Sequence, residues 1–201
     1  MKTYEIKKFT TETPDWAKIP TLSLDYRYID TPEWAKAWAQ ICYSADAIFV
    51  HLRVIDPVIR REETGTLGAP CLDSCLEFFI SPTEGDKRYL NFEFNSNKCL
   101  FLGFGSGKTT LLRIITEAEE LFAPAVNFTE DGWEIFYKIP EEFVRRFFPD
   151  FTLTAGKKIR ANCYKCMEGT EPGHFLSWSP VVADDFTFHT PDSFGEMIFS
   201  E

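Results

Sequence analysis

The sequence lacks any long hydrophobic run. No stretch approaches the ~18 uninterrupted apolar residues that a membrane-spanning helix requires. Residues Met1 to Lys8 also lack the apolar segment of a secretion signal. We therefore expect a soluble, cytoplasmic protein with no membrane partner, or an extracellular one only if the chain is a fragment of a secreted protein.

Basic residues are scarce relative to acidic ones. Lys and Arg together number 21 against 31 Asp and Glu, so the net charge is −10. A surface with this excess of negative charge repels a phosphate backbone, and it cannot gain binding energy by releasing the counterions of that backbone. Nucleic acid is therefore excluded as an expected partner.

Cysteine is too sparse for a disulfide scaffold, with six in 201 residues. We expect these thiols to be small buried hydrophobic side chains. The pairs Cys71/Cys75 and Cys163/Cys166 together offer four thiolates to a zinc ion. Residues i and i+3 on a strand point to opposite faces, however, so Cys163 and Cys166 converge only if their strand breaks between them. A zinc site is therefore not expected.

The residues that are abundant indicate a β-rich globular domain. Hydrophobic residues make up 44% of the chain and charged residues 26%, which is the ordinary globular range. Twenty Phe, seven Tyr and five Trp favour the pleated, half-buried surface of a sheet. The length fits one domain, residues 1–201.

Apolar and polar residues alternate with a period of two over several short segments, which predicts strands. These segments are residues 47–54, 73–81, 89–95, 133–140 and 158–166. Many short strands separated by turns indicate an all-β fold, an antiparallel β-sandwich of jelly-roll type with two mainly antiparallel sheets. One short helix is predicted near residues 140–147, because Pro140 and two acids open that segment.

Two acidic residues, Glu77 and Glu93, lie on the polar faces of a predicted hairpin. A turn centred on Gly85 places them opposite each other on strands ~4.8 Å apart. Directly opposed like charges are destabilising, so something must offset them. Three interpretations remain open: the carboxylate pair of a glycoside hydrolase, two acceptors for sugar hydroxyls neutralised by a residue such as Arg113, or two exposed acids on a solvated face.

Residues Gly103–Thr109 resemble the phosphate-binding loop of nucleotide-binding proteins, and they supply a minor alternative function. The spacing is wrong, because the position that should carry the first glycine is Leu102. A loop one residue short cannot wrap its amides around a phosphate in the same way. We therefore expect a glycine-rich hairpin here.

A third predicted strand adds Arg160, Asn162 and Tyr164 to the polar face that carries the two acids. Planar polar groups can accept hydrogen bonds from vicinal hydroxyls or donate to them, while aromatic rings cover the C–H face of a sugar ring. This combination suits a pyranose, so the expected ligand is a carbohydrate.

Five segments together resemble the family 9 carbohydrate-binding modules and their DOMON-like relatives, in the order found in that family. The segments are residues 54–58, 73–80, 91–95, 176–179 and 189–195. The resemblance implies a β-sandwich that binds the end of a sugar chain such as a glucan or xylan without catalysing a reaction. It also implies a role in polysaccharide breakdown beside a partner glycoside hydrolase.

The resemblance also implies a set of ligand-binding residues. These residues are Glu77, Glu93, Asn95, Asn162, Tyr164, Asp185, Phe188 and His189. We expect Phe188 to be an exposed stacking ring, unless it belongs to the core. The family places a Trp at the opposite wall of the site, where this chain has Cys71, which cannot stack on a sugar.

Members of the family carry structural calcium, although no other cofactor is expected. The acids available for a calcium ion are Asp25, Asp30, Asp46 and Asp56. Oxygen ligands of this kind suit calcium, but they do not form a recognisable loop motif.

Overall fold

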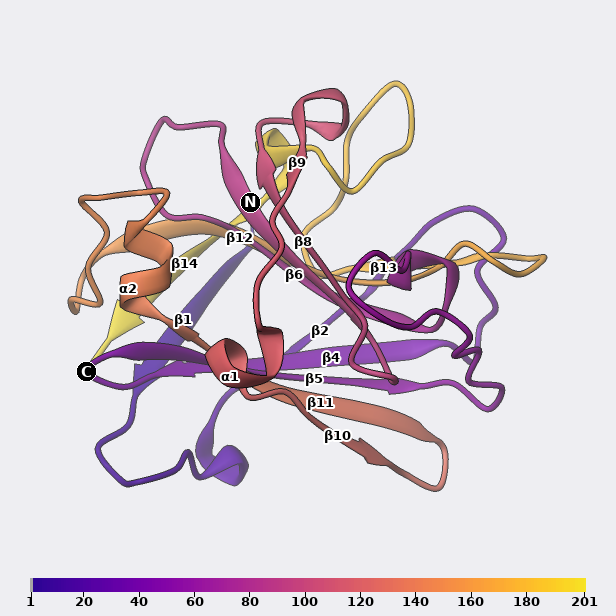
Figure 1. The fold of residues 1–201 in the computed structure, drawn as a ribbon, viewed down its shortest axis with the longest axis horizontal. Helices are drawn as coiled ribbons and strands as arrows, with labels where there is room; N and C mark the ends of the chain where they lie inside the picture. Colours follow the sequence, from indigo (N-terminus) through magenta and orange to yellow (C-terminus); the bar gives the residue numbers. More distant parts are fainter. Residues whose placement is uncertain (1) are drawn as a thin grey trace.

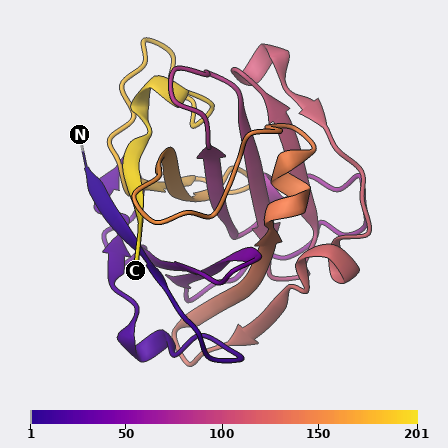
Figure 2. The same ribbon diagram turned by 90° about the vertical axis from the view of Figure 1, so that its left-hand side faces the viewer.

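Fourteen strands form one continuous, curled sheet in the computed structural model, which describes residues 2–201. The sheet folds into two layers that pack face to face (Figures 1 and 2). The first layer contains β10 (Ala125–Phe128), β11 (Gly132–Pro140), β5 (Ala47–Ile55), β4 (Lys36–Tyr43) and β2 (Thr21–Ser23). The second contains β14 (Gly195–Ser200), β12 (Lys158–Met167), β6 (Cys75–Ser81), β7 (Tyr89–Asn95), β8 (Leu100–Gly105) and β9 (Leu112–Arg113), with β13 (His174–Ser177) and β3 (Tyr26–Arg27) at its side.

The predicted β-sandwich is confirmed, with one difference in how its layers are joined. Strand β1 (Thr3–Lys8) pairs in parallel with β14 in one layer and with β4 in the other. Every other strand pair within residues 2–201 is antiparallel. The two expected sheets are therefore one sheet, because β1 satisfies the backbone groups of an edge strand in each layer.

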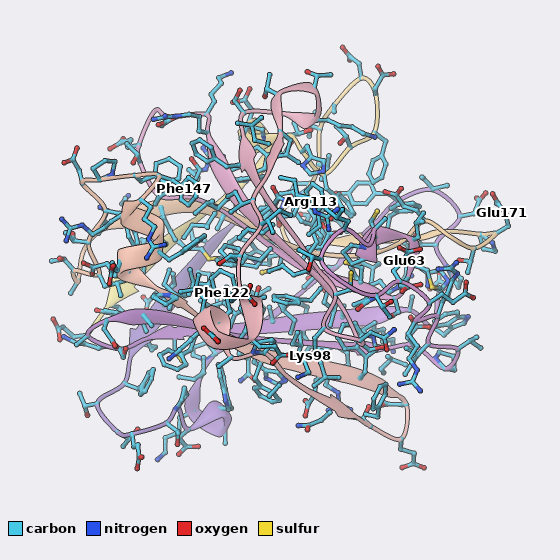
Figure 3. All side chains as sticks on the ribbon, viewed as in Figure 1. Glu63, Lys98, Arg113, Phe122, Phe147 and Glu171 are labelled. Carbon is cyan, nitrogen blue, oxygen red and sulfur yellow. The ribbon has the colours of Figure 1, made fainter. Side chains whose placement is uncertain are left out.

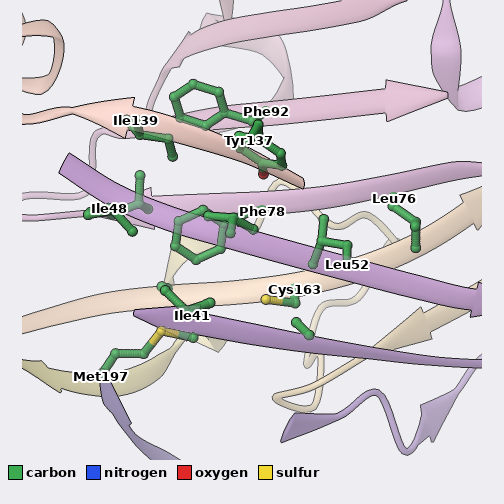
Figure 4. Packing of buried hydrophobic residues seen from close by; sticks show 14 of the residues in the cluster. Ile41, Ile48, Leu52, Leu76, Phe78, Phe92, Tyr137, Ile139, Cys163 and Met197 are labelled. Carbon is green, nitrogen blue, oxygen red and sulfur yellow. The ribbon is translucent and has the colours of Figure 1, made fainter. Parts of the chain in front are cut away.

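The predicted alternation places one side of each strand in the core between the layers. Phe78 and Phe92 meet Leu52 and Tyr137 from the facing layer, as Figure 4 shows. Cys163 points into the same core. Fully burying one large apolar side chain stabilises the fold by ~1.5–3 kcal/mol, so this shared core is the main source of stability.

Both α-helices within residues 2–201 are short, and neither is long and apolar enough to cross a membrane. The predicted helix is confirmed as α2 (Glu141–Arg145). A second helix, α1 (Ala118–Phe122), was not predicted, and it places Phe122 against Phe92 in the core. Four 3-10 turns complete the elements: η1 (Trp16–Lys18), η2 (Pro70–Leu72), η3 (Lys108–Thr110) and η4 (Pro191–Ser193).

Strands β6 and β7 are buried on both faces, which sets the environment of the acidic pair. Their second face carries aromatic rings, including Phe79 and Tyr89, beside the polar residues. Parts of residues 56–74 and 178–194, which precede β6 and β14, pack over these rings. The expected open polar face is therefore largely covered, because its rings gain more from burial than from exposure.

Candidate functional site

A pocket of about 380 Å³ lies on the second face of β6 and β7, where the covering loops leave it accessible. Its lining combines acidic, basic and aromatic side chains. The lining residues are Ala69, Pro70, Cys71, Glu77, Glu93, Phe101, Lys108, Arg113, Glu168, Phe175, Phe186, Thr187, Phe188 and His189. A concave site of this size, with rings and a few convergent polar groups, fits a small-molecule ligand.

The two acids predicted to oppose each other do so, because β6 and β7 pair with Glu77 directly across from Glu93. Glu77 is 3% exposed and Glu93 is 5% exposed, so the interpretation of two solvated surface acids is wrong. The thiol of Cys166 donates to Glu77 Oε1 at 2.8 Å, and Asn91 Nδ2 donates to Glu93 Oε1 at 2.7 Å. Gly103 makes room for Asn91, since a Cβ there would lie 2.4 Å from Asn91 Oδ1.

Burial changes the acidity of both carboxyl groups. Loss of solvation raises the pKa of Glu77 to about 8. The same loss, followed by the charge of Glu77, raises the pKa of Glu93 well above its usual range. At neutral pH this pair therefore retains protons that exposed acids would have lost, and it can both donate to a ligand hydroxyl and accept from one.

Arg113 does not form an ion pair with the acids, contrary to its expected role. Its Nη2 donates to the backbone carbonyls of Thr66 and Gly68 at 2.8 and 2.7 Å. Its guanidinium also lies over the ring of Phe101, 4.8 Å from the centroid. Figure 3 shows Arg113 among the closely packed side chains near β8. Arg113 thus fixes the loop at one wall of the pocket.

His189 lies beside Glu93, with 3.9 Å between Nε2 and the carboxylate Oε1. Its Nδ1 is 2.9 Å from the hydroxyl of Tyr89, within hydrogen-bond distance. Burial, followed by the charge of Lys108, lowers the pKa of His189 to about 4. The ring is therefore uncharged at neutral pH, and it offers a polar group to a ligand without neutralising Glu93.

Phe188 lines the pocket but is 7% exposed, which corrects the expectation of an exposed ring. It stacks on Tyr164 with 4.2 Å between centroids and 17° between planes, and its carbonyl accepts from the Tyr164 hydroxyl at 3.2 Å. Phe186 is the exposed ring of this loop, at 38%. Both rings line the pocket, and the run Phe186-Thr187-Phe188 does not by itself distinguish the exposed ring from the buried one.

Four of the expected site residues, Asn95, Asn162, Tyr164 and Asp185, do not line the pocket. Asn95 donates to Asp73 at 2.8 Å, and Asn162 donates to the carbonyl of Ser179 at 3.0 Å. These amides secure the loops that cover the face, so their hydrogen-bonding groups are already used. The side chain of Asp185 is exposed on its loop.

Several lining residues were not found from the sequence. Glu168 follows β12, Phe101 lies on β8, Phe175 lies on β13, and Lys108 begins a 3-10 turn. They come from segments far apart in the chain, and none belongs to a recognisable motif. Only the packing of these segments brings them to one pocket.

Residues 103–105 end β8, and residues 106–109 lie in its connection to β9, with which β8 pairs in an antiparallel hairpin. The element that follows is the short 3-10 turn η3, whereas a phosphate-binding loop precedes a full helix. The expected glycine-rich hairpin is confirmed. Lys108 reaches the pocket, so this segment contributes to the same site.

Within residues 2–201, the four acids considered for calcium are not among the potential metal ligands that lie together. Asp25, Asp30 and Asp46 are exposed and lie apart from one another in the chain. Asp56 is buried with one unpaired oxygen, Oδ1, but its Oδ2 lies 3.4 Å from the ammonium of Lys165. That ammonium already supplies the positive charge at this position.

Comparisons with solved structures support a carbohydrate-binding fold. A protein from Bacteroides uniformis ATCC 8492, to which carbohydrate binding is assigned provisionally, has 28% identity and a TM-score of 0.84, with 99% of each chain covered. A family 9 carbohydrate-binding module from Caldicellulosiruptor kristjanssonii has 14% identity and a TM-score of 0.69 in complex with cellotriose, over 99% of this chain and 94% of the module. Its glucose complex gives the same identity and TM-score, over 99% and 96%.

A family model for carbohydrate-binding family 9 matches residues 11–199. No curated protein matches the chain. The matched family consists of non-catalytic modules, which contradicts the alternative of a glycoside hydrolase that uses Glu77 and Glu93. The predicted resemblance is confirmed across nearly the whole sequence. The chain belongs to carbohydrate-binding family 9.

Proposed function

We propose that this protein binds the terminal unit of a carbohydrate in the pocket that contains Glu77 and Glu93. The observation that carries the proposal is the pair of buried, opposed carboxyl groups beside the ring of Phe186. Buried polar groups are normally hydrogen-bonded, and a sugar hydroxyl can donate to one carboxyl group and accept from the other.

The shape and composition of the pocket favour a neutral sugar. Its volume of about 380 Å³ suits one or two sugar rings better than a long chain lying across a surface. Phe101 and Phe186 offer apolar area for the C–H face of a ring. Because relatives of this fold are bound to glucose and cellotriose, a glucose-based oligosaccharide is the first ligand to test.

Isothermal titration with glucose, cellotriose and xylotriose tests this proposal. We expect one saturable site per chain, with affinity reduced about tenfold or more in Glu93→Gln, because a buried hydrogen bond to a charged or shared-proton group contributes ~1.5–3 kcal/mol. Glu84→Gln serves as a matched control, since Glu84 is an exposed acid in the turn between β6 and β7.

Two results would contradict the proposal. One is the absence of binding to every oligosaccharide on a glycan array by folded protein. The other is equal loss of affinity in Glu84→Gln and Glu93→Gln.

We further infer a role beside a glycoside hydrolase in polysaccharide breakdown, as the family resemblance implies. A non-catalytic module raises the local concentration of an attached or associated enzyme on its substrate. Adding the protein to a purified hydrolase from the same organism should increase its activity on an insoluble polysaccharide and leave its activity on a soluble aryl glycoside unchanged. No difference between the two substrates would argue against this role.

A further inference from the structure

Beside the carbohydrate pocket, three potential metal ligands converge from two strands. The thiols of Cys75 and Cys166 and a carboxylate oxygen of Glu77 all lie within 4.8 Å of one another. Cys75 lies directly opposite Cys166 in the pairing of β6 with β12. Glu77 follows Cys75 by two residues, so the pleat points both side chains to the same face.

The donor separations of a tetrahedral zinc site fall within the 4.8 Å limit that these three atoms meet. Two sulfurs that each lie ~2.3 Å from zinc are about 3.8 Å apart. In the structure, Cys166 Sγ lies 2.8 Å from Glu77 Oε1. Small rotations of these side chains would therefore bring all three donor atoms within bonding distance of one ion.

Within residues 2–201, no basic side chain forms an ion pair with any of these three groups. Two buried acids form ion pairs, Asp73 with Arg60 and Asp56 with Lys165, whereas Glu77 forms none. A divalent cation that binds here would displace the protons of the two thiols and of Glu77, and the three groups would coordinate it together.

Cys71 lies between the pocket and the cluster, where it is a candidate for a fourth ligand. It lines the pocket together with Glu77, so an ion entering the pocket reaches the cluster from that side. Its backbone carbonyl lies 3.6 Å from Cys166 Sγ, which places residue 71 against the cluster. Sulfur ligands select soft or borderline ions such as zinc over calcium.

We propose that Cys75, Cys166 and Glu77 form a site for a thiophilic divalent cation such as zinc, with Cys71 or water as the fourth ligand. The site is distinct from the calcium sites implied by the family resemblance, because its donors are mainly sulfur. It shares Glu77 with the proposed carbohydrate pocket but does not depend on sugar binding.

Cys163 offers a matched control for this proposal. It lies on the same strand as Cys166 and is equally buried, but it points into the core between the layers (Figure 4). A Cys→Ala substitution at either position removes one buried thiol, whereas only the substitution at Cys166 removes a proposed ligand.

The experiment uses the full chain, reduced and stripped of metal, without any sugar present. Zinc affinity is measured by competition with a chromophoric chelator, and cadmium is added to detect thiolate-to-metal charge transfer in the ultraviolet. We expect one ion per chain, with affinity weakened at least about tenfold in Cys166→Ala and in Glu77→Gln, and unchanged in Cys163→Ala. Glu77→Gln preserves side-chain size, so it remains informative if Cys166→Ala fails to fold.

Three results would overturn the proposal. The first is no zinc or cadmium binding by the reduced wild-type protein. The second is full binding by Cys166→Ala and Glu77→Gln. The third is that the reduced protein binds no metal, while mild oxidation joins Cys75 and Cys166 in a disulfide. Sugar titrations of the same metal-free protein separate failure of this site from failure of the carbohydrate site.

Discussion

Glu77 and Glu93 face each other across β6 and β7, with both carboxyl groups buried. Opposed like charges weaken a strand pair, and burial adds the cost of losing solvation. The fold keeps this pair although it lowers stability, which is typical of residues retained for binding.

Removing one carboxyl group of this pair is expected to stabilise the fold. Glu93→Gln retains an acceptor for Asn91 and removes a carboxyl group that is disfavoured by its burial and by its proximity to Glu77, so we expect the free energy of unfolding at pH 8 to rise by about 1 kcal/mol. Urea denaturation followed by tryptophan fluorescence measures the change, with Glu84→Gln as the surface control. A lower stability of Glu93→Gln would mean that the carboxyl group contributes more to folding than its burial costs.

Phe186 and Phe188 are expected to separate binding from stability. Phe188→Ala removes a buried ring stacked on Tyr164, so it should reduce stability by ~3 kcal/mol or more. Phe186→Ala removes a partly exposed pocket ring, so it should weaken sugar binding by ~1–2 kcal/mol and change the melting temperature little. Calorimetric titration and thermal melts of both variants test the pair. If Phe188→Ala instead lost affinity and Phe186→Ala lost stability, Phe188 would be the ring that stacks on the sugar.

His189 is expected to make the fold sensitive to acid. Burial lowers its pKa from 6.5 to about 4 in the folded state, so the unfolded chain binds a proton first as the pH falls. The stability that depends on an uncharged His189 is complete above pH 6.5 and is lost between pH 6.5 and about 4, up to about 3 kcal/mol. Urea midpoints of wild type and His189→Gln across this range measure it. Parallel curves for the two proteins would contradict the prediction.

Lys165 and Asp56 form a buried ion pair with 3.4 Å between Nζ and Oδ2, and both side chains are inaccessible. Ser74 donates to the same oxygen at 2.5 Å, and Trp133 Nε1 donates to Ser74 at 2.9 Å. Lys165→Met leaves Asp56 without its cation and should cost ~3–5 kcal/mol. The double variant with Asp56→Asn should recover much of that loss. Thermal melts of the two variants provide the comparison, and a failure to recover would assign the loss to packing.

Calcium is expected to leave stability unchanged, because Lys165 already supplies the positive charge beside Asp56. Melting temperatures in excess calcium and in EDTA should therefore agree when zinc is absent. A clear rise with calcium would reveal a binding site among Asp25, Asp30, Asp46 and Asp56, or elsewhere in the chain, and would contradict the interpretation of Lys165.

Local patterns in the sequence determined much of this protein. A side-chain period of two assigned the faces of β6, β7 and β12, and it separated Cys163 from Cys166. The turn at Gly85 then determined the register that opposes Glu77 and Glu93. These features depend on residues close together in the chain, so they could be predicted without the rest of the fold.

The tertiary structure alone decided which of these side chains are available to a ligand. The loops that precede β6 and β14 cover the polar face, use Asn95 and Asn162 as anchors, and leave a pocket with Phe186 at its wall. The parallel pairing of β1 with both layers and the approach of Cys75 to Cys166 are also non-local. Such contacts depend on the packing of segments distant in sequence, and a period of two does not encode that packing.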